Sequence, residues 1–347
     1  MKTSYLLRRI GIALSTIFFA LIISYILFEL SPLSPVNYIM QSFGLMPVGG
    51  GGLASNRAAA AVIPSSLSTQ EYKELLTYVD SIMPHGNPII EVAMYIYNVF
   101  HGNMGISILY AEPVTKLIAE RLPWTLFIVV TANILSFLIG IYLGQLMAYN
   151  RGKSIDQVIT QFITVKRSIP IYIYAAIFLL FLGFYLHWFP VAGAYSAGVV
   201  IGFNLPFIAS VLYHAFLPIF TLTFATFGHW ALSMRGNTIA QLGEDYVSYA
   251  EMRGLPGSWI ARNYVGRNSL LPLYTSIIIA LGFSFGGTVF VESTFSYPGI
   301  GQLYTTALSN NDWPLAMGVL IIIVVAIVIG MLIADLTYSL IDPRVRH

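Results

Sequence analysis

Long uncharged stretches alternate with short charged ones along most of the chain. Residues 10–28, 122–150, 268–291 and 313–334 each run without Asp, Glu, Lys or Arg. A bilayer core of about 30 Å takes about 20 residues of α-helix at 1.5 Å each. Each of these four stretches is therefore expected to form one transmembrane helix.

The stretch from 168 to 234 holds 67 uncharged residues, which is too long for a single crossing. Turn signals fall near its middle, at His187–Pro190, Gly193, Asn204 and Pro206. It is expected to hold two helices joined by an external hairpin. The pattern predicts an all-α, polytopic membrane protein with six transmembrane helices.

Composition agrees with this class. Of 347 residues, 57% are hydrophobic and 9% charged, against about 25% charged in an ordinary soluble domain. A net charge of +2 is too small to indicate nucleic-acid binding, and zero cysteines exclude disulfides and Cys-based zinc sites. The apolar run of residues 10–28 is too long for a signal peptide and lacks a small-residue cleavage site, so it is interpreted as a retained first helix.

Basic residues set the expected orientation. With the N-terminus inside, 13 of the 17 Lys and Arg residues fall on the inner side. The two short outer loops, near 187–206 and 293–313, receive none. Both termini are expected in the cytoplasm and the protein in the cell membrane.

The segment 31–121 is too long for a plain connector. Gly49–Gly52 is typical of a flexible strip, Ser68–Glu71 forms a capping box, and Pro88 predicts a helix through Phe100. This external helical cap is either a structural lid or a docking platform for a soluble partner. The expected domains are 1–30 with the first helix, 31–121 as the cap, and 122–347 as the transmembrane core.

The inner segment 235–267 is a polar island between two spans. Glu244 and Asp245 place negative charge at a helix start, and Gly254 supplies its stop. A second short helix is expected from Ser258 to Arg267. The segment is either an amphipathic connector on the membrane surface or a knob that fits a cytoplasmic partner.

Catalytic and ligand-binding motifs are missing. Gly152-Lys153-Ser154 resembles the end of a phosphate-binding loop, but its first glycine would fall at Met147. No HExxH, GxSxG or ligand-spaced acidic cluster occurs, and the six histidines are scattered. No catalytic, metal or cofactor site is expected in this chain, which leaves a membrane-embedded enzyme without support.

The acids nearest the spans, Glu29, Glu292 and Asp335, are expected at span ends. Ion-driven carriers usually bury such groups within the bilayer, so the pattern favours a conduit whose energy comes from elsewhere. A stand-alone channel or secondary carrier remains the alternative. The spacings Gly140…Gly144 and Gly282…Gly286 allow close helix approach and are interpreted as packing within the chain.

Motifs spread over nearly the whole chain resemble those of the permease subunits of oligopeptide/dipeptide-type ABC importers. They comprise Tyr5–Arg9, Leu30-Ser31-Pro32, Gly102–Gly105, Pro113-Val114, Glu120–Pro123, Thr125-Leu126, Ile139–Ile141, Leu143-Gly144, Trp188–Gly193, Asp245–Val247, Ala250, Arg253–Leu255, Arg267–Pro272, Gly287, Val291-Glu292, Phe295, Pro298–Gly301, Asp312, Pro314, Asp335, Tyr338 and Asp342–Arg344. Two features depart from the pattern: the segment 41–88 is longer than usual, and Glu251-Met252 stand where a basic and a small residue are usual.

The resemblance implies a type I importer fold and a set of partners. These are a second permease, two ATP-binding cassette ATPases that bind the ATP and Mg²⁺, and an external substrate-binding protein. The implied cargo is peptides, with oligosaccharides or nickel as alternatives. The implied ATPase-coupling residues are Glu244, Asp245, Tyr246, Val247, Ala250, Glu251, Arg253, Gly254 and Leu255.

Overall fold

The computed structural model describes residues 3–29 and 88–341. The expected glycine strip at 49–52 and capping box at 68–71 lie outside these residues. The described chain divides into two compact units, the first formed by Met1–Ala13, Arg121–Gln302 and Val325–His347, the second by Leu14–Glu120 and Leu303–Val324.

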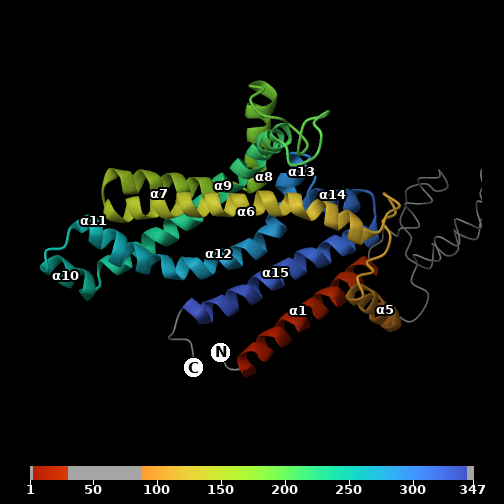
Figure 1. Ribbon diagram of the computed structural model, residues 1–347, viewed down its shortest axis with the longest axis horizontal. Coiled ribbons are helices and arrows are strands. Elements are labelled where there is room, and N and C mark those ends of the chain that lie inside the picture. The colour runs from red at the N-terminus through yellow and green to blue at the C-terminus, as the bar shows by residue number, and fades with distance from the viewer. Residues whose placement is uncertain (1–2, 30–87, 342–347) are drawn as a thin grey trace, which may run out of the picture. The chain divides into compact units, whose positions relative to one another are not determined.

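Helices make up nearly all of the described structure, as the sequence predicts (Figure 1). Their order is α1 (Thr3–Glu29), α5 (Pro88–Phe100), α6 (Val114–Tyr149), α7 (Ser154–Arg167), α8 (Ile171–Phe178), the π-helix η1 (Leu179–Tyr185), α9 (Leu205–Leu242), α10 (Asp245–Met252), α11 (Gly257–Ile260), the π-helix η2 (Ala261–Gly266), α12 (Arg267–Gly287), α13 (Val289–Thr294), α14 (Ile300–Ser309) and α15 (Trp313–Ile341).

The six expected spans match helices in place along the chain. Within the described residues, α1, α6, α9 and α15 are each long and apolar enough to cross a membrane, and α7 with α8–η1 adds a fifth candidate, bent by 96°. Helix α12 occupies the place of the fifth expected span but is not among those candidates. It is 21 residues long, and its first three residues, Arg267, Asn268 and Ser269, are polar.

Turn chemistry places the start of α9 where the sequence predicts it. The side chain of Asn204 accepts a hydrogen bond from the N–H of Phe207 at 2.9 Å, and Pro206 follows in the first helical turn. Both features are typical of a helix N-terminus. The predicted helix Pro88–Phe100 is also confirmed, as α5.

The sequence analysis predicted no element between residues 151 and 167, but Ser154–Arg167 forms the helix α7. Its buried residues are Asp156, Ile163 and Lys166, and they lie on one helical face since they are seven and three residues apart. Charged residues among these positions obscure that pattern when the sequence is considered alone.

Glycines bring the helices of the first unit close together. A Cβ added at Gly140 would lie 2.3 Å from Cβ of Trp230, and one at Gly144 would lie 2.5 Å from the carbonyl oxygen of Ala231. Helices α6 and α9 therefore pack at these two glycines. Gly282 of α12 meets Gly330 of α15, whose added Cβ would lie 2.8 Å from Cα of Gly282. The prediction of packing within the chain is confirmed for Gly140, Gly144 and Gly282.

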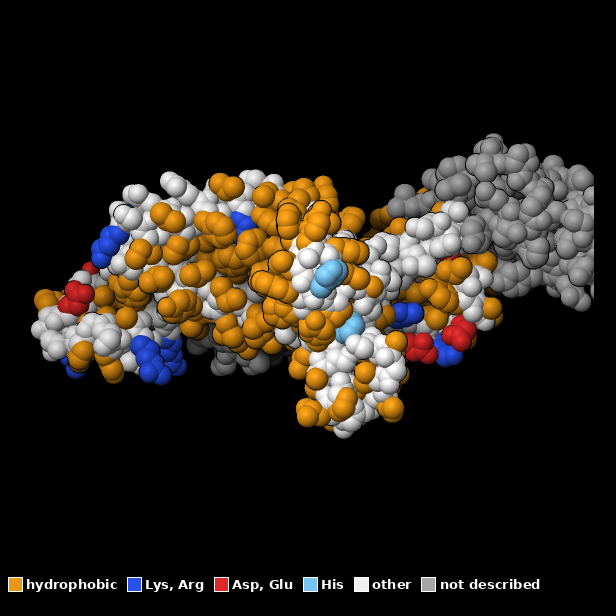
Figure 2. All heavy atoms as spheres, turned by 90° about the horizontal axis from the view of Figure 1, so that it is seen from above, with side chains coloured by type: hydrophobic (Ala, Val, Ile, Leu, Met, Phe, Trp, Pro, Cys, Tyr) orange, Lys and Arg blue, Asp and Glu red, His pale blue; other side chains and the backbone are white. Residues whose placement is uncertain are grey.

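Within this unit, α6, α7, α9 and α12 run alongside one another, and α10 and α11 lie together at one end (Figure 1). Charged side chains gather at that end, whereas the flanks of the helices are mostly hydrophobic (Figure 2). Such a distribution suits a helical bundle whose flanks contact lipid.

In the second unit, Asp312 holds the hairpin that precedes α6. Its Oδ2 accepts hydrogen bonds from Oγ of Ser107 at 2.5 Å and from the N–H of Leu109 at 3.0 Å. Its Oδ1 accepts from the N–H of Leu315 at 3.2 Å in the first turn of α15. Asp312 is 1% exposed, so one buried carboxylate joins a loop to a helix start.

Candidate functional site

Helix α10 begins and ends as its sequence predicts. Glu244 takes the N-cap position in an extended conformation, and Asp245 lies in the first turn. At the other end, the N–H of Leu255 donates to the carbonyl of Ala250 at 3.3 Å, and the N–H of Gly254 to that of Glu251 at 2.8 Å. With Gly254 at φ +71°, these two bonds form a Schellman C-cap, which favours glycine at this position.

The predicted second helix, Ser258–Arg267, is confirmed as the helical segment α11–η2, although it continues into α12 without a break. Helix α11 begins at Gly257 after Pro256, continues through η2 and runs directly into α12. Because this segment has no break, α11, η2 and α12 form one continuous helical stretch. Residues 245–266, from α10 through η2, are called the knob below.

The knob has a small core of its own. Val247, Ala250, Ile260 and Val265 are buried together, and partly buried side chains pack around them: Leu242, Tyr246, Leu255 and Tyr264. Burial of this kind contributes about 25 cal/mol per Å² of apolar surface. The two halves of the knob are therefore fixed to each other by packing and form one body.

The nine coupling residues implied by the resemblance divide between the core and the surface of the knob. Val247 and Ala250 are buried, and Tyr246 and Leu255 are half-buried. The exposed members are Glu244, Asp245, Glu251, Arg253 and Gly254. Only the exposed members offer side chains or backbone to another protein.

Two exposed apolar side chains on the same helix were not among these nine residues. Tyr249 is 64% exposed and Met252 73% exposed, and they lie three residues apart on α10. The signal for them in the sequence is the apolar character of both residues within a polar segment. Together with Arg253 they give the outer face of α10 a mixed apolar and basic surface.

Hydrogen bonds attach the knob to both helices that carry it. The hydroxyl of Tyr246 donates to Oε1 of Gln241 on α9 and accepts from Nδ2 of Asn268 on α12 at 3.1 Å. Nearby, Nδ2 of Asn237 donates to the carbonyl of Ser269 at 3.1 Å. These bonds attach the knob to the end of α9 and to the start of α12.

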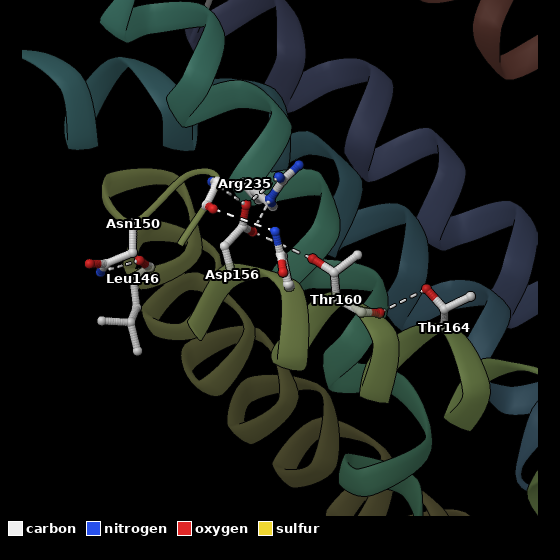
Figure 3. A network of polar contacts seen from close by, with 8 residues as sticks. Leu146, Asn150, Asp156, Thr160, Thr164 and Arg235 are labelled. Carbon is white, nitrogen blue, oxygen red and sulfur yellow. Dashed lines mark hydrogen bonds and ion pairs between the residues drawn. The ribbon is translucent and has the colours of Figure 1, made fainter. Parts of the chain in front are cut away.

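A partly buried ion pair joins α7 to α9 (Figure 3). Nε of Arg235 lies 2.6 Å from Oδ1 of Asp156, and Nη2 lies 2.7 Å from Oδ2. Oδ2 also accepts from the N–H of Gly152 at 3.2 Å, and the hydroxyl of Thr160 lies 3.4 Å from Oδ1. The two-point geometry of an arginine fork on a carboxylate is among the strongest polar contacts in proteins.

The sequence analysis did not single out this pair. Asp156 is the one acid between Arg151 and Arg167, and Arg235 is the one charged residue of α9. Isolated opposite charges in apolar helices are a signal for pairing, but the two residues are 79 positions apart.

Glu292 follows the end of α12 by five residues, and its place at the end of a span stays a prediction. It sits in α13 and is 0% exposed. Its Oε2 accepts from the N–H of Gly301 at 2.7 Å and of Gln302 at 3.2 Å, while Oγ1 of Thr125 accepts from that of Ile300 at 2.8 Å. The acid thus caps the N-terminus of α14, where unpaired N–H groups favour negative charge.

Metal-binding geometry is not found in the part of the chain that the structure describes, where no three His, Asp or Glu side chains come together. The site instead offers a packed knob, an exposed face on α10 and polar ties to α9 and α12.

The chain is similar to known membrane proteins. Residues 136–347 match the family model of the binding-protein-dependent transport system inner membrane component. The chain is 31% identical to the oligopeptide transport system permease protein AppB of Bacillus subtilis over 259 residues, 74% of this chain and 80% of that protein. It is 25% identical to the dipeptide transport system permease proteins DppB of Lactococcus lactis, over 99% of both chains, and of Escherichia coli, over 99% of this chain and 98% of that one.

Proposed function

Since the chain belongs to the family of binding-protein-dependent transport system inner membrane components, we propose that it is the translocation subunit of an ATP-driven importer of di- and oligopeptides. The observation that carries this proposal is the similarity to peptide permeases along the whole chain. Every relative named above transports peptides by its name, which supports peptides over the oligosaccharide alternative.

The subunit works as part of a larger assembly. It pairs with a second permease, and the substrate path runs between the two. Two ATPase subunits bind on the cytoplasmic side and hold the ATP and Mg²⁺, while a substrate-binding protein delivers peptide from outside. Both termini of the chain lie in the cytoplasm, in agreement with the distribution of Lys and Arg.

The knob seats in a cleft of an ATPase subunit. Its exposed face supports this role, because Tyr249 and Met252 supply apolar contact area and Arg253 a charge. ATP binding closes the ATPases, and the knob carries that displacement to α9 and α12 through Tyr246. Alternating access is then a shift between two states, driven by the preference of ATP for one of them.

Reconstitution into vesicles tests this function. Vesicles that contain both permeases, both ATPases and the external binding protein are expected to take up labelled peptide only with ATP. Vesicles that contain this subunit alone are expected to take up none. Uptake by the isolated subunit would instead favour a stand-alone channel or carrier.

A further inference from the structure

Three contacts tie α7 to α9 along their whole shared length. The first is the ion pair of Asp156 with Arg235, whose side chains are 4% and 28% exposed. The second joins Ile163 to Gly228, where an added Cβ would lie 2.7 Å from Cγ2 of the isoleucine. Asp156 and Ile163 are seven residues apart on α7, and Arg235 and Gly228 are seven residues apart in the opposite direction on α9. The two antiparallel helices therefore stay in register over two turns.

The third contact is made by a buried lysine. Nζ of Lys166 donates to the carbonyl of Phe224, and to that of Ala225 at 3.2 Å, and lies 3.8 Å from the centre of the Phe227 ring. Lys166 is 3% exposed. A desolvated ammonium group gains from both carbonyl oxygens and aromatic faces, so this contact holds the far end of α7 against α9.

The ion pair and the Lys166 contact lie at the two ends of α7, and the close packing of Ile163 on Gly228 lies between them. Breaking a buried pair by removing one partner leaves an uncompensated charge, which disfavours separation of the helices. The ion pair also lies toward the end of α9 that leads into the knob, because Arg235 is seven residues before the last residue of α9, Leu242.

We propose that Asp156 and Arg235 are positioning residues that make α7 and α9 move as one rigid body, so that the displacement of the knob reaches α7. This inference rests on the proposed function. It gives α7 a part in transmitting the displacement of the knob. The direct hydrogen bonds of the knob reach only α9 and α12.

A disulfide provides the test, because the chain has no cysteine of its own. Ile163→Cys with Gly228→Cys places two Cβ atoms at a separation suited to a disulfide. In the full reconstituted complex, oxidation of this pair is expected to leave ATP-driven peptide uptake unchanged relative to the reduced form. Uptake lost on oxidation and regained on reduction would mean that the two helices separate during transport, and would overturn the proposal.

Asp156→Asn supplies the second arm. It is expected to lower the peptide taken up per ATP hydrolysed by about fivefold or more, and oxidation of the Ile163→Cys/Gly228→Cys pair in the same chain is expected to restore that ratio. Should this variant not assemble, Arg235→Lys, which keeps the charge but loses the two-point fork, is measured in its place with the same expectation.

The ratio separates coupling from mere stability. A variant that lowers the amount of complex but keeps the ratio of uptake to hydrolysis would show a purely structural role and overturn the inference. A wild-type complex without ATP-driven peptide uptake would refute the proposed function instead. A wild-type complex that couples, with no rescue by oxidation, would refute only the inference.

Discussion

Asn268, at the start of α12, donates a hydrogen bond at 3.1 Å to the hydroxyl of Tyr246 on α10. The same hydroxyl donates to Gln241 near the end of α9. One phenolic oxygen therefore joins the helix before the knob, the knob itself and the helix after it. This shared atom adds a polar joint between the three elements to the packing of the knob core.

Replacing Tyr246 by Phe removes this joint while keeping the ring. Without the hydroxyl, the partly buried side-chain amides of Gln241 and Asn268 lose their hydrogen-bond partner. This loss lowers the free energy of unfolding by about 1–3 kcal/mol. We expect lower uptake per ATP hydrolysed, measured in reconstituted vesicles. Tyr142→Phe is the matched control, because Tyr142 is 69% exposed on α6 and lies outside the knob. Equal effects of the two substitutions would contradict a special role for Tyr246.

Arg253 tests the outer face of the knob. It is exposed at the C-cap of α10, so Arg253→Glu changes the charge presented to a partner without disturbing the knob core. We expect weaker binding of the ATPase subunits, measured by co-purification, and a loss of ATP-driven uptake. Arg262→Glu, at another exposed position of the knob, is the control for net charge. Unchanged uptake by Arg253→Glu would count against seating through this face.

Ala250 tests the helical core of the knob. It is 3% exposed in the interior of α10, where proline costs about 3 kcal/mol by removing a backbone donor and clashing with the preceding turn. Ala250→Pro is expected to uncouple ATP hydrolysis from peptide uptake. Gly257→Pro is the control, since Gly257 is the first residue of α11, where proline is tolerated, and nothing lies within 4 Å of its added Cβ. Coupled transport by Ala250→Pro would show that an intact α10 is not required.

Local chemistry explains which parts of the structure could be predicted. Residues with a strong conformational preference gave correct limits: Asn204 and Pro206 start α9, Pro88 starts α5, and Gly254 stops α10. Each of these signals acts within one helical turn, so the surrounding fold does not override it.

Features that depend on distant neighbours could not be predicted. Asp156 pairs with Arg235, which is 79 positions away in the sequence. Glu292 is buried where the start of α14 packs on it, with the N–H of Gly301 donating to its carboxylate. Uncharged length predicted the places of helices such as α6, α9 and α15, but it hid α7, in which Asp156 pairs with Arg235 and Lys166 is buried against α9. The exposure of the nine coupling residues likewise depends on how the two halves of the knob pack.

Gly140 tests the contact between α6 and α9. A methyl group there would lie 2.3 Å from Cβ of Trp230 and 2.9 Å from the carbonyl oxygen of Phe227. Gly140→Ala is therefore expected to destabilise the protein by about 1–3 kcal/mol through overpacking, measured as a lower thermal unfolding midpoint. Gly236→Ala should have the opposite sign, because nothing lies within 4 Å of its added Cβ and alanine favours a helix by about 1 kcal/mol. A tolerated Gly140→Ala would contradict the close approach of these helices.

Substitution of Asp312 tests the hydrogen bonds that hold the hairpin before α6 to the start of α15 in the second unit. Its carboxylate accepts from Ser107, Leu109 and Leu315 and is 1% exposed, so Asp312→Ala removes a helix cap and leaves buried donors unpaired. We expect a loss of about 2–4 kcal/mol, seen as a lower thermal unfolding midpoint, with Asp312→Asn intermediate because one oxygen acceptor remains. Glu112→Gln, in an exposed pair with Lys116 at 2.9 Å, should cost less than about 1 kcal/mol. An Asp312→Ala protein as stable as Glu112→Gln would show that the hairpin before α6 is held by its own backbone bonds instead.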